Sequence, residues 1–197
     1  MFARRSALAS SLHGASQRFA GLAAKVVIAE RHPLSILQVS AFATTIPDTE
    51  QALFNALGLP VAAANQFSGD SQLSLRSIAP GVWQLVGEVS HTAHAEQLRQ
   101  TLQGIATVVD ISHGRTALQI SGLCSAKTIA KFCGLDLDPA KFSTGSSTQT
   151  RFGHIAMTLS RLDDAPTFEI LVFRGYAQHV FETLVEGAAE FGLRIEQ

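Results

Sequence analysis

Asp110, Ser112 and His113 supply the three side chains of a hydrolytic triad within one short stretch of sequence. The stretch alternates apolar and polar residues, which predicts a β-strand that ends near His113. On such a strand Asp110 and Ser112 share one face, whereas His113 points to the other face or into a turn. A working triad needs the imidazole between the other two groups. We therefore expect Asp110 and Ser112 to fix a turn through hydrogen bonds to backbone groups, without catalysis.

Histidines offer a second kind of chemistry, metal binding. His91 and His94 are spaced so that a helix would place both imidazoles on one face. The sequence suggests no third ligand nearby and has no His-Glu-x-x-His motif, so we interpret both as solvated helix positions. The remaining candidate histidines are isolated in the sequence: His32, His154 and His179.

Two polar stretches could also carry chemistry. Residues 143–148 (Ser-Thr-Gly-Ser-Ser-Thr) could cradle an anion, but they lack a lysine and precede a predicted strand, so we expect a polar loop. Asp163 and Asp164 are adjacent carboxylates before Ala-Pro. Neighbouring side chains diverge and are poorly placed to share an acid–base task, so we expect a turn there.

The cysteines, Cys124 and Cys133, flank one predicted helix. A helix of about nine residues spans ~13 Å, whereas a disulfide needs Cα atoms within roughly 7 Å. We expect both thiols to be free, as in a reducing cytoplasm. Their spacing does not match a zinc site.

Composition limits the classes of partner. The chain has 197 residues and a formal net charge of −1, which gives no reason to expect nucleic acid or an anionic membrane. Its apolar runs are shorter than the ~20 residues of a membrane span. Charged residues make up 16% of the chain, against about 25% in typical soluble domains. We expect a cytoplasmic protein with part of its surface covered by other subunits; a well-buried monomer is the alternative.

The N-terminal stretch, residues 1–24, contains arginines and small apolar residues but no acidic residue. This composition is typical of a transit peptide, an amphipathic arm or a flexible end. We expect residues 1–24 to form an arm that lies over a partner subunit. Deleting residues 1–20 is expected to weaken assembly and to leave the fold intact. Residues 25–197 are expected to form a single domain.

Hydrophobic periodicity and turn residues predict an α+β fold. The stretch Thr107–Gly134 is typical of a strand with Val109 and Ile111 on its apolar face, a tight turn at 113–115, a return strand, and a helix capped by Ser125. Because strands joined by tight turns are antiparallel, we expect antiparallel or mixed sheets covered by helices. Other expected strands span residues 34–43, 73–78, 82–87, 149–161 and 168–173, and other expected helices span 48–57, 90–104 and 177–191.

Two segments resemble known families. The Asp-Ile-Ser-His sequence at 110–113, followed by a strand ending in Ser121-Gly122 and a helix, is similar to the folate-binding domain of the glycine-cleavage aminomethyltransferase family. The run from Phe142 to Gly192 (FSTGSSTQTRFGHIAMTLSRLDD…EGAAEFG) resembles the gamma-subunit family of heterotetrameric sarcosine oxidase. The resemblance covers about residues 106 to 192 and implies the folate-binding-domain type of α+β fold.

The resemblance to the gamma-subunit family also implies a function. It implies a non-catalytic subunit of a complex that oxidises sarcosine to glycine and releases hydrogen peroxide with formaldehyde or methylene-tetrahydrofolate. The implied partners are alpha, beta and delta subunits, with FAD, FMN, NAD and tetrahydrofolate on the two larger ones and zinc on the smallest. No catalytic, cofactor-binding or metal-binding residue is implied here, because the strand at Thr150–Leu159 lacks the carboxylate that aminomethyltransferases carry at that place.

Three alternatives remain open. The chain could be a gamma-like subunit of a related N-methyl amine dehydrogenase, for example one for N-methylglutamate. A stand-alone folate-dependent one-carbon transferase is the second, and it would need a buried carboxylate in the sheet. A folate-binding assembly factor is the third, and it would carry a cysteine in a Lys-Gly-Cys-Tyr-x-Gly-Gln-Glu type of motif, which surrounds neither Cys124 nor Cys133.

Overall fold

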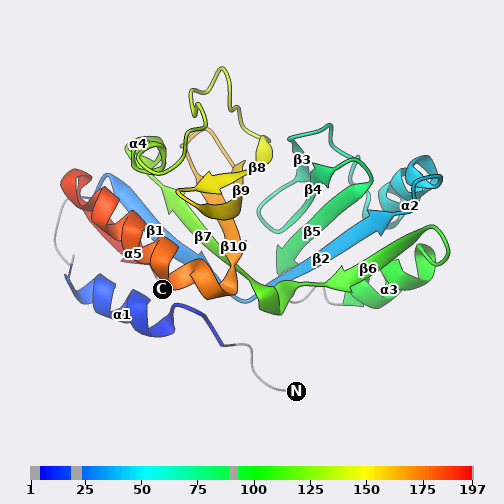
Figure 1. The fold of residues 1–197 in the computed structure, drawn as a ribbon, viewed down its shortest axis with the longest axis horizontal. Helices are drawn as coiled ribbons and strands as arrows, with labels where there is room; N and C mark the ends of the chain where they lie inside the picture. The colour runs from blue at the N-terminus through cyan, green and yellow to red at the C-terminus, as the bar shows by residue number, and fades with distance from the viewer. Residues whose placement is uncertain (1–4, 19–23, 89–92, 197) are drawn as a thin grey trace. The chain divides into compact units, whose positions relative to one another are not determined.

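The chain is divided into two compact units in a computed structural model, which describes residues 5–18, 24–88 and 93–196 (Figure 1). Unit 1 consists of Met1–His32 and Gly114–Gln197, and unit 2 consists of Pro33–His113. In the described residues, each unit builds its own β-sheet and hydrophobic core. The expected α+β class with antiparallel and mixed sheets is confirmed. The single domain over residues 25–197 stays a prediction.

The sheet of unit 1 is mixed, with the strand order β11-β1-β7-β10-β9-β8. Neighbouring strands are antiparallel except β1 and β11, which pair in parallel. The strands are β1 (Val26–Arg31), β7 (Arg115–Ser121), β8 (Ser147–Phe152), β9 (Ile155–Arg161), β10 (Phe168–Phe173) and β11 (Leu193–Glu196).

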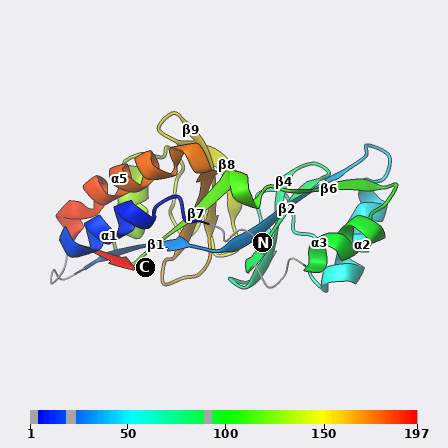
Figure 2. The ribbon, with the colours of Figure 1, turned by 90° about the horizontal axis from the view of Figure 1, so that it is seen from below.

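Three helices cover the apolar face of this sheet: α1 (Ala9–Arg18), α4 (Ser125–Ala130) and α5 (Ala177–Ala188). Helix α5 has the apolar spacing that the sequence predicts, and it buries Val180, Phe181 and Leu184 against the sheet. Helix α1 lies along α5 and β11 (Figure 2). Leu8 is completely buried and Leu12 nearly so in the same core. The described part of the expected arm therefore packs on its own chain.

The sheet of unit 2 is antiparallel, with the strand order β3-β4-β5-β2-β6. Its strands are β2 (Leu34–Ala41), β3 (Phe67–Gly69), β4 (Leu73–Ala79), β5 (Val82–Glu88) and β6 (Ala106–Asp110). Helices α2 (Ile46–Leu57) and α3 (Ala93–Thr101) lie side by side on one face (Figures 1 and 2). Leu53 of α2 and Leu98 of α3 pack against strand residues such as Leu37 and Leu85.

The expected hairpin at 113–115 is wrong. Strand β6 ends in the sheet of unit 2, and β7 begins in the sheet of unit 1, so the two strands are not partners. The short 3-10 turn η2 (Ser112–Gly114) carries the chain from one unit to the other. Val109 is 52% exposed, whereas Val108 packs on the core of unit 2, so the apolar face of β6 is also opposite to the expectation.

Other boundaries differ in smaller ways. The strand expected over residues 149–161 is a hairpin of β8 and β9, because Gly153 adopts a positive φ of 55° and turns the chain. Ser125 does not cap α4, since Cys124 occupies the N-cap position. The hydroxyl of Ser125 instead donates to the carbonyl oxygen of Pro166 at 3.0 Å. Strands β1 and β3 were not expected.

Candidate functional site

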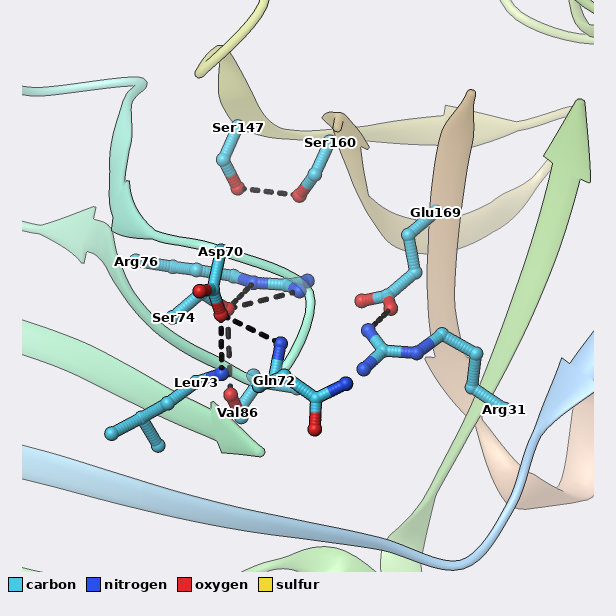
Figure 3. A network of polar contacts seen from close by, with 10 residues as sticks. All are labelled: Arg31, Asp70, Gln72, Leu73, Ser74, Arg76, Val86, Ser147, Ser160 and Glu169. Atoms are coloured by element: carbon cyan, nitrogen blue, oxygen red, sulfur yellow. Dashed lines mark hydrogen bonds and ion pairs between the residues drawn. The ribbon is translucent and has the colours of Figure 1, made fainter. Parts of the chain in front are cut away.

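A row of polar residues crosses the face of the unit 1 sheet that the helices leave uncovered. The strand register places Gln119 of β7 opposite Glu169 of β10, Glu169 opposite Ser160 of β9, and Ser160 opposite Ser147 of β8. Glu169, Ser160 and Ser147 are each fully buried. The hydroxyl oxygens of Ser147 and Ser160 lie 2.8 Å apart and share a hydrogen bond (Figure 3). We call these four residues the Glu169 row.

The buried carboxylate of this row is neutralised by an arginine. Arg31, at the end of β1, donates from Nη1 to Oε2 of Glu169 (Figure 3). The side chain of Arg31 is 15% exposed and that of Glu169 is 0% exposed. A carboxylate held in such an ion pair is stabilised in its charged form. This pair can therefore order the sheet face, but it leaves no free carboxylate there for proton transfer.

Unit 2 has a similar row on the face of its sheet that lies opposite α2 and α3. Gln38 of β2 is opposite Gln84 of β5, which is opposite Arg76 of β4. Arg76 is completely buried and donates to the hydroxyl of Ser74 at 3.4 Å (Figure 3). Its guanidinium carbon also lies 6.0 Å from the ring centroid of Phe67. Arginine and glutamine side chains of this kind can bind carboxylates or amides, but they supply no nucleophile.

The loop before β4 holds a perturbed carboxylate. Backbone N–H groups of Leu73 and Gln72 donate to Oδ1 of Asp70 at 3.1 and 2.7 Å (Figure 3). These bonds favour the charged form and lower the pKa of Asp70, the bond from Leu73 having the larger effect. Asp70 is exposed and closes a turn that begins at Gly69. Its geometry is that of an Asx turn, which is a structural role.

A hollow of about 450 Å³ lies beside α2 in unit 2. Small residues line most of it, and of its lining residues Glu50 alone is charged. A lone carboxylate among small residues has no second titratable group for acid–base work, so the hollow is a recess of mixed polarity without a catalytic constellation. The lining residues are Glu50, Ala62, Ala63, Ala64, Asn65, Ser77, Ile78, Ala79, Pro80, Gly81 and Trp83.

The structure brings Asp110 and Ser112 together but gives them the structural role expected from the sequence. Oδ1 of Asp110 accepts hydrogen bonds from the hydroxyl and the backbone N–H of Ser112. The Ser112 hydroxyl oxygen in turn accepts the N–H of Ile36 at 2.8 Å, which joins the end of β6 to β2. Ser112 is thus committed to the backbone, and the prediction that these residues fix a turn is confirmed.

The acidic and polar loop candidates also have structural partners. Oδ1 of Asp163 accepts the N–H groups of Ala165 and Thr167 at 2.9 and 2.8 Å, so the expected turn is present. Thr144 donates to Asp164 at 2.7 Å, which ties the polar loop to that turn. The loop is therefore held by a carboxylate of its own chain, an arrangement that does not favour an anion.

The structure describes both cysteines but only some of the candidate histidines. Cys124 and Cys133 are free thiols, as expected. His91 and the side chain of His94 lie outside the described residues. Within the residues that the structure describes, no group of three or more His, Cys, Asp or Glu side chains could hold a metal ion.

None of the described helices combines the length and apolar character needed to cross a membrane.

The sequence interpretation did not single out Glu169, Arg31 or Arg76. A usable signal was present for Glu169 and Arg76, because each is the only charged residue of its strand, as in Phe168-Glu-Ile-Leu-Val-Phe173. A charge flanked by apolar residues on a central strand must be buried, and a buried charge needs a partner. What the sequence cannot give is the identity of that partner, since Arg31 and Glu169 are 138 positions apart.

Comparison with known proteins shows similarity to one family over most of the chain. The sarcosine oxidase, gamma subunit family matches residues 40–190. Sarcosine oxidase subunit gamma of Corynebacterium sp. (strain U-96) is 28% identical over 146 residues, which are 71% of this chain and 68% of that protein.

Solved structures give the same relationship. A chain of heterotetrameric sarcosine oxidase from Corynebacterium sp. U-96, solved in complex with pyrrole 2-carboxylate, superimposes with a TM-score of 0.86 at 25% identity, covering 96% of both chains. Aminomethyltransferase T of the glycine cleavage system from Bartonella henselae superimposes with a TM-score of 0.66 at 16% identity, over 94% of this chain and 50% of that one. The second likeness shows a shared fold. Because the family match spans far more than half of the sequence, this chain belongs to the sarcosine oxidase gamma subunit family.

Proposed function

We propose that this chain is the gamma subunit of a heterotetrameric sarcosine oxidase and that it contributes structure without catalytic residues. The observation that carries the proposal is the superposition on a chain of the Corynebacterium complex over 96% of both chains. The complex is an oxidoreductase acting on CH–NH donors, which converts sarcosine to glycine and forms hydrogen peroxide with formaldehyde or methylene-tetrahydrofolate. The alpha, beta and delta subunits are its partners, in the cytoplasm.

In this proposal FAD, FMN, NAD, tetrahydrofolate and zinc belong to the partner subunits. The hydrogen bonds and ion pairs of the described polar side chains support a structural role for this chain. Glu169 is paired with Arg31, Ser112 is committed to Asp110 and Ile36, and Asp70 is bound by backbone N–H groups. Each of these side chains stabilises its own unit, which is what a scaffold subunit requires.

The test is to tag the chain in its native host and purify it with its companions. We expect three companion subunits and sarcosine-dependent formation of hydrogen peroxide and formaldehyde. A panel of amines that includes N-methylglutamate separates sarcosine oxidase from the related dehydrogenase. The chain produced alone should show no turnover and should aggregate at high concentration, because only 16% of its residues are charged. Turnover of an N-methyl amine by the isolated chain would refute the proposal.

One observation favours a second candidate, a stand-alone folate-dependent one-carbon transferase. Such an enzyme needs a buried carboxylate on its sheet, and Glu169 is a buried carboxylate. Its pairing with Arg31 argues against that role, because the arginine neutralises the charge that a substrate amine would need. Titration of the isolated chain with tetrahydrofolate distinguishes the two candidates: micromolar binding abolished by Glu169→Gln would favour the transferase.

A further inference from the structure

One end of unit 1 presents exposed aromatic rings beside an arginine. Phe173, 47% exposed, ends β10, and Tyr176, 52% exposed, lies in the 3-10 turn η3 (Arg174–Tyr176) that follows. Arg115 begins β7 and is opposite Phe173 in the strand register. Its guanidinium carbon lies 3.6 Å from the centroid of the Phe173 ring. We call Arg115, Phe173, Arg174 and Tyr176 the Arg115 surface.

The guanidinium of Arg115 stacks on an apolar ring without a counter-ion. In the described residues it donates to no acceptor and pairs with no carboxylate. Its partial burial lowers the pKa of Arg115, although an arginine still keeps its proton at physiological pH. Burying a charge without a partner is unfavourable. A carboxylate placed over this surface would supply the missing acceptor in a charge-assisted, bidentate geometry.

Further positive charge lies next to this surface. Nη2 of Arg174 donates to the backbone carbonyl oxygen of Arg5 at 2.8 Å, which brings the exposed Arg5 to the same place. The hydroxyl of Ser6, the residue after Arg5, donates to the carboxylate of Glu30, so this carboxylate already has a partner. Over the whole sequence, unit 1 has 13 basic and 10 acidic residues, whereas unit 2 has 2 and 6, so their formal charges are +3 and −4. The near-neutral total charge therefore hides a basic unit, and the exposed rings of Phe173 and Tyr176 belong to that unit.

We propose that the Arg115 surface docks an acidic segment of another protein subunit. A carboxylate of that segment pairs with Arg115, and apolar atoms beside the carboxylate cover Phe173 and Tyr176. Arginine and aromatic residues are enriched at the cores and hot spots of protein interfaces. A nucleic acid is a poorer match, because phosphate binding relies on many cations along a strip. The inference rests on the proposed function only in taking the partner to be a subunit of the same complex.

The first experiment measures recovery of companion subunits with the tagged full-length chain in its native host. Arg115→Glu should lower the amount of companion per chain about tenfold, since hot-spot arginines contribute at least that much to affinity. Arg151→Glu is the matched control, because Arg151 is an exposed arginine on β8 of the same sheet; it should change recovery less than twofold. Circular dichroism and the urea midpoint establish that both variants are folded. Equal recovery by Arg115→Glu and wild type overturns the proposal.

The second experiment identifies the contacting group. Arg115→Lys keeps the charge and introduces an amine that a carbodiimide can join to a carboxylate in direct contact. Mass spectrometry should find position 115 joined to an Asp or Glu of a companion subunit. Joining only to another copy of this chain overturns the proposal, and so does loss of the companions after nuclease treatment.

The two proposals fail in different ways. An active sarcosine-oxidising complex whose composition is unchanged by Arg115→Glu refutes the docking site and leaves the proposed function intact. If Arg115→Glu loses the companions but the wild-type complex shows no sarcosine-dependent activity, the proposed function is refuted and the docking site is supported.

Discussion

Arg31 at the end of β1 and Glu169 near the start of β10 form an ion pair across the sheet of unit 1, with the carboxylate completely buried. Strand β7 lies between β1 and β10 in that sheet, so the pair spans a strand. The row it belongs to continues into the hydrogen-bonded hydroxyls of Ser160 and Ser147. A buried pair of this kind fixes strand order, because a displaced register would leave one charge alone in the interior.

Replacing Glu169 by alanine should destabilise the chain by about 3–5 kcal/mol, because it breaks a buried ion pair by removing the carboxylate that neutralises the guanidinium of Arg31. Urea unfolding followed by circular dichroism measures the loss. The double variant Arg31→Met with Glu169→Leu should recover most of the stability, since it removes both charges and keeps apolar volume. If Glu169→Ala and the double variant were equally unstable, the charge imbalance left by the single substitution would not be the cause of the loss.

The sequence predicted helices α2 to α5 and most strands well because these elements depend on local patterns, whereas helix α1 was expected only as an N-terminal arm. Helix α5 follows from apolar residues at spacings of three and four, and the end of α2 follows from Gly58, which adopts a φ of 67°. The failure at 113–115 has a different cause. A turn between two apolar strands is typical of a hairpin, but nothing local shows that β6 and β7 pair with other strands, in different sheets. Sheet membership depends on long-range pairing.

The candidate site was less predictable than the fold. The turn roles of Asp110, Ser112 and Asp163 follow from short-range hydrogen bonds, and the structure confirms them. The Glu169 row joins the consecutive strands β8, β9 and β10 to β7, which lies about 50 positions before β10 in the chain, so the three-dimensional register is needed to reveal the whole row. The family resemblance at residues 106 to 192 is confirmed by a match over residues 40–190.

Asp70 should make stability depend on pH in the acid range. Its pKa is lowered in the folded chain by backbone N–H donors of Leu73 and Gln72, so its contribution is complete above the unfolded pKa of about 3.9 and is lost as pH falls through the lower folded pKa. Asp70→Asn should therefore lower the thermal midpoint at pH 6, and the difference from wild type should shrink toward pH 2.5. A difference that stays constant between these pH values would show that the charge of Asp70 does not contribute.

Gly187 should be required for the packing of Phe132, which follows α4, against α5. A Cβ at this position would lie 2.6 Å from Cε2 of Phe132, whose ring is held against Phe152 with centroids 4.9 Å apart. Gly187→Ala should cost about 1–3 kcal/mol from overpacking, reduced by the better helix propensity of alanine, about 1 kcal/mol. Gly134→Ala is the matched control, because a methyl group added there would meet no other atom within 4 Å. A urea midpoint unchanged by Gly187→Ala would mean that the Phe132 ring moves aside freely.

The N-terminal segment gives the last prediction, because the structure changes what its removal should do. Leu8 is 0% exposed and packs in the core of unit 1, so Leu8→Ala should cost about 2–5 kcal/mol. Deleting residues 1–20 should lower the urea midpoint by at least as much, in contrast to the intact fold expected from the sequence alone. Leu123→Ala is the control, since Leu123 is 81% exposed and should be neutral. A truncated chain as stable as wild type would show that this segment serves assembly and is not part of the core.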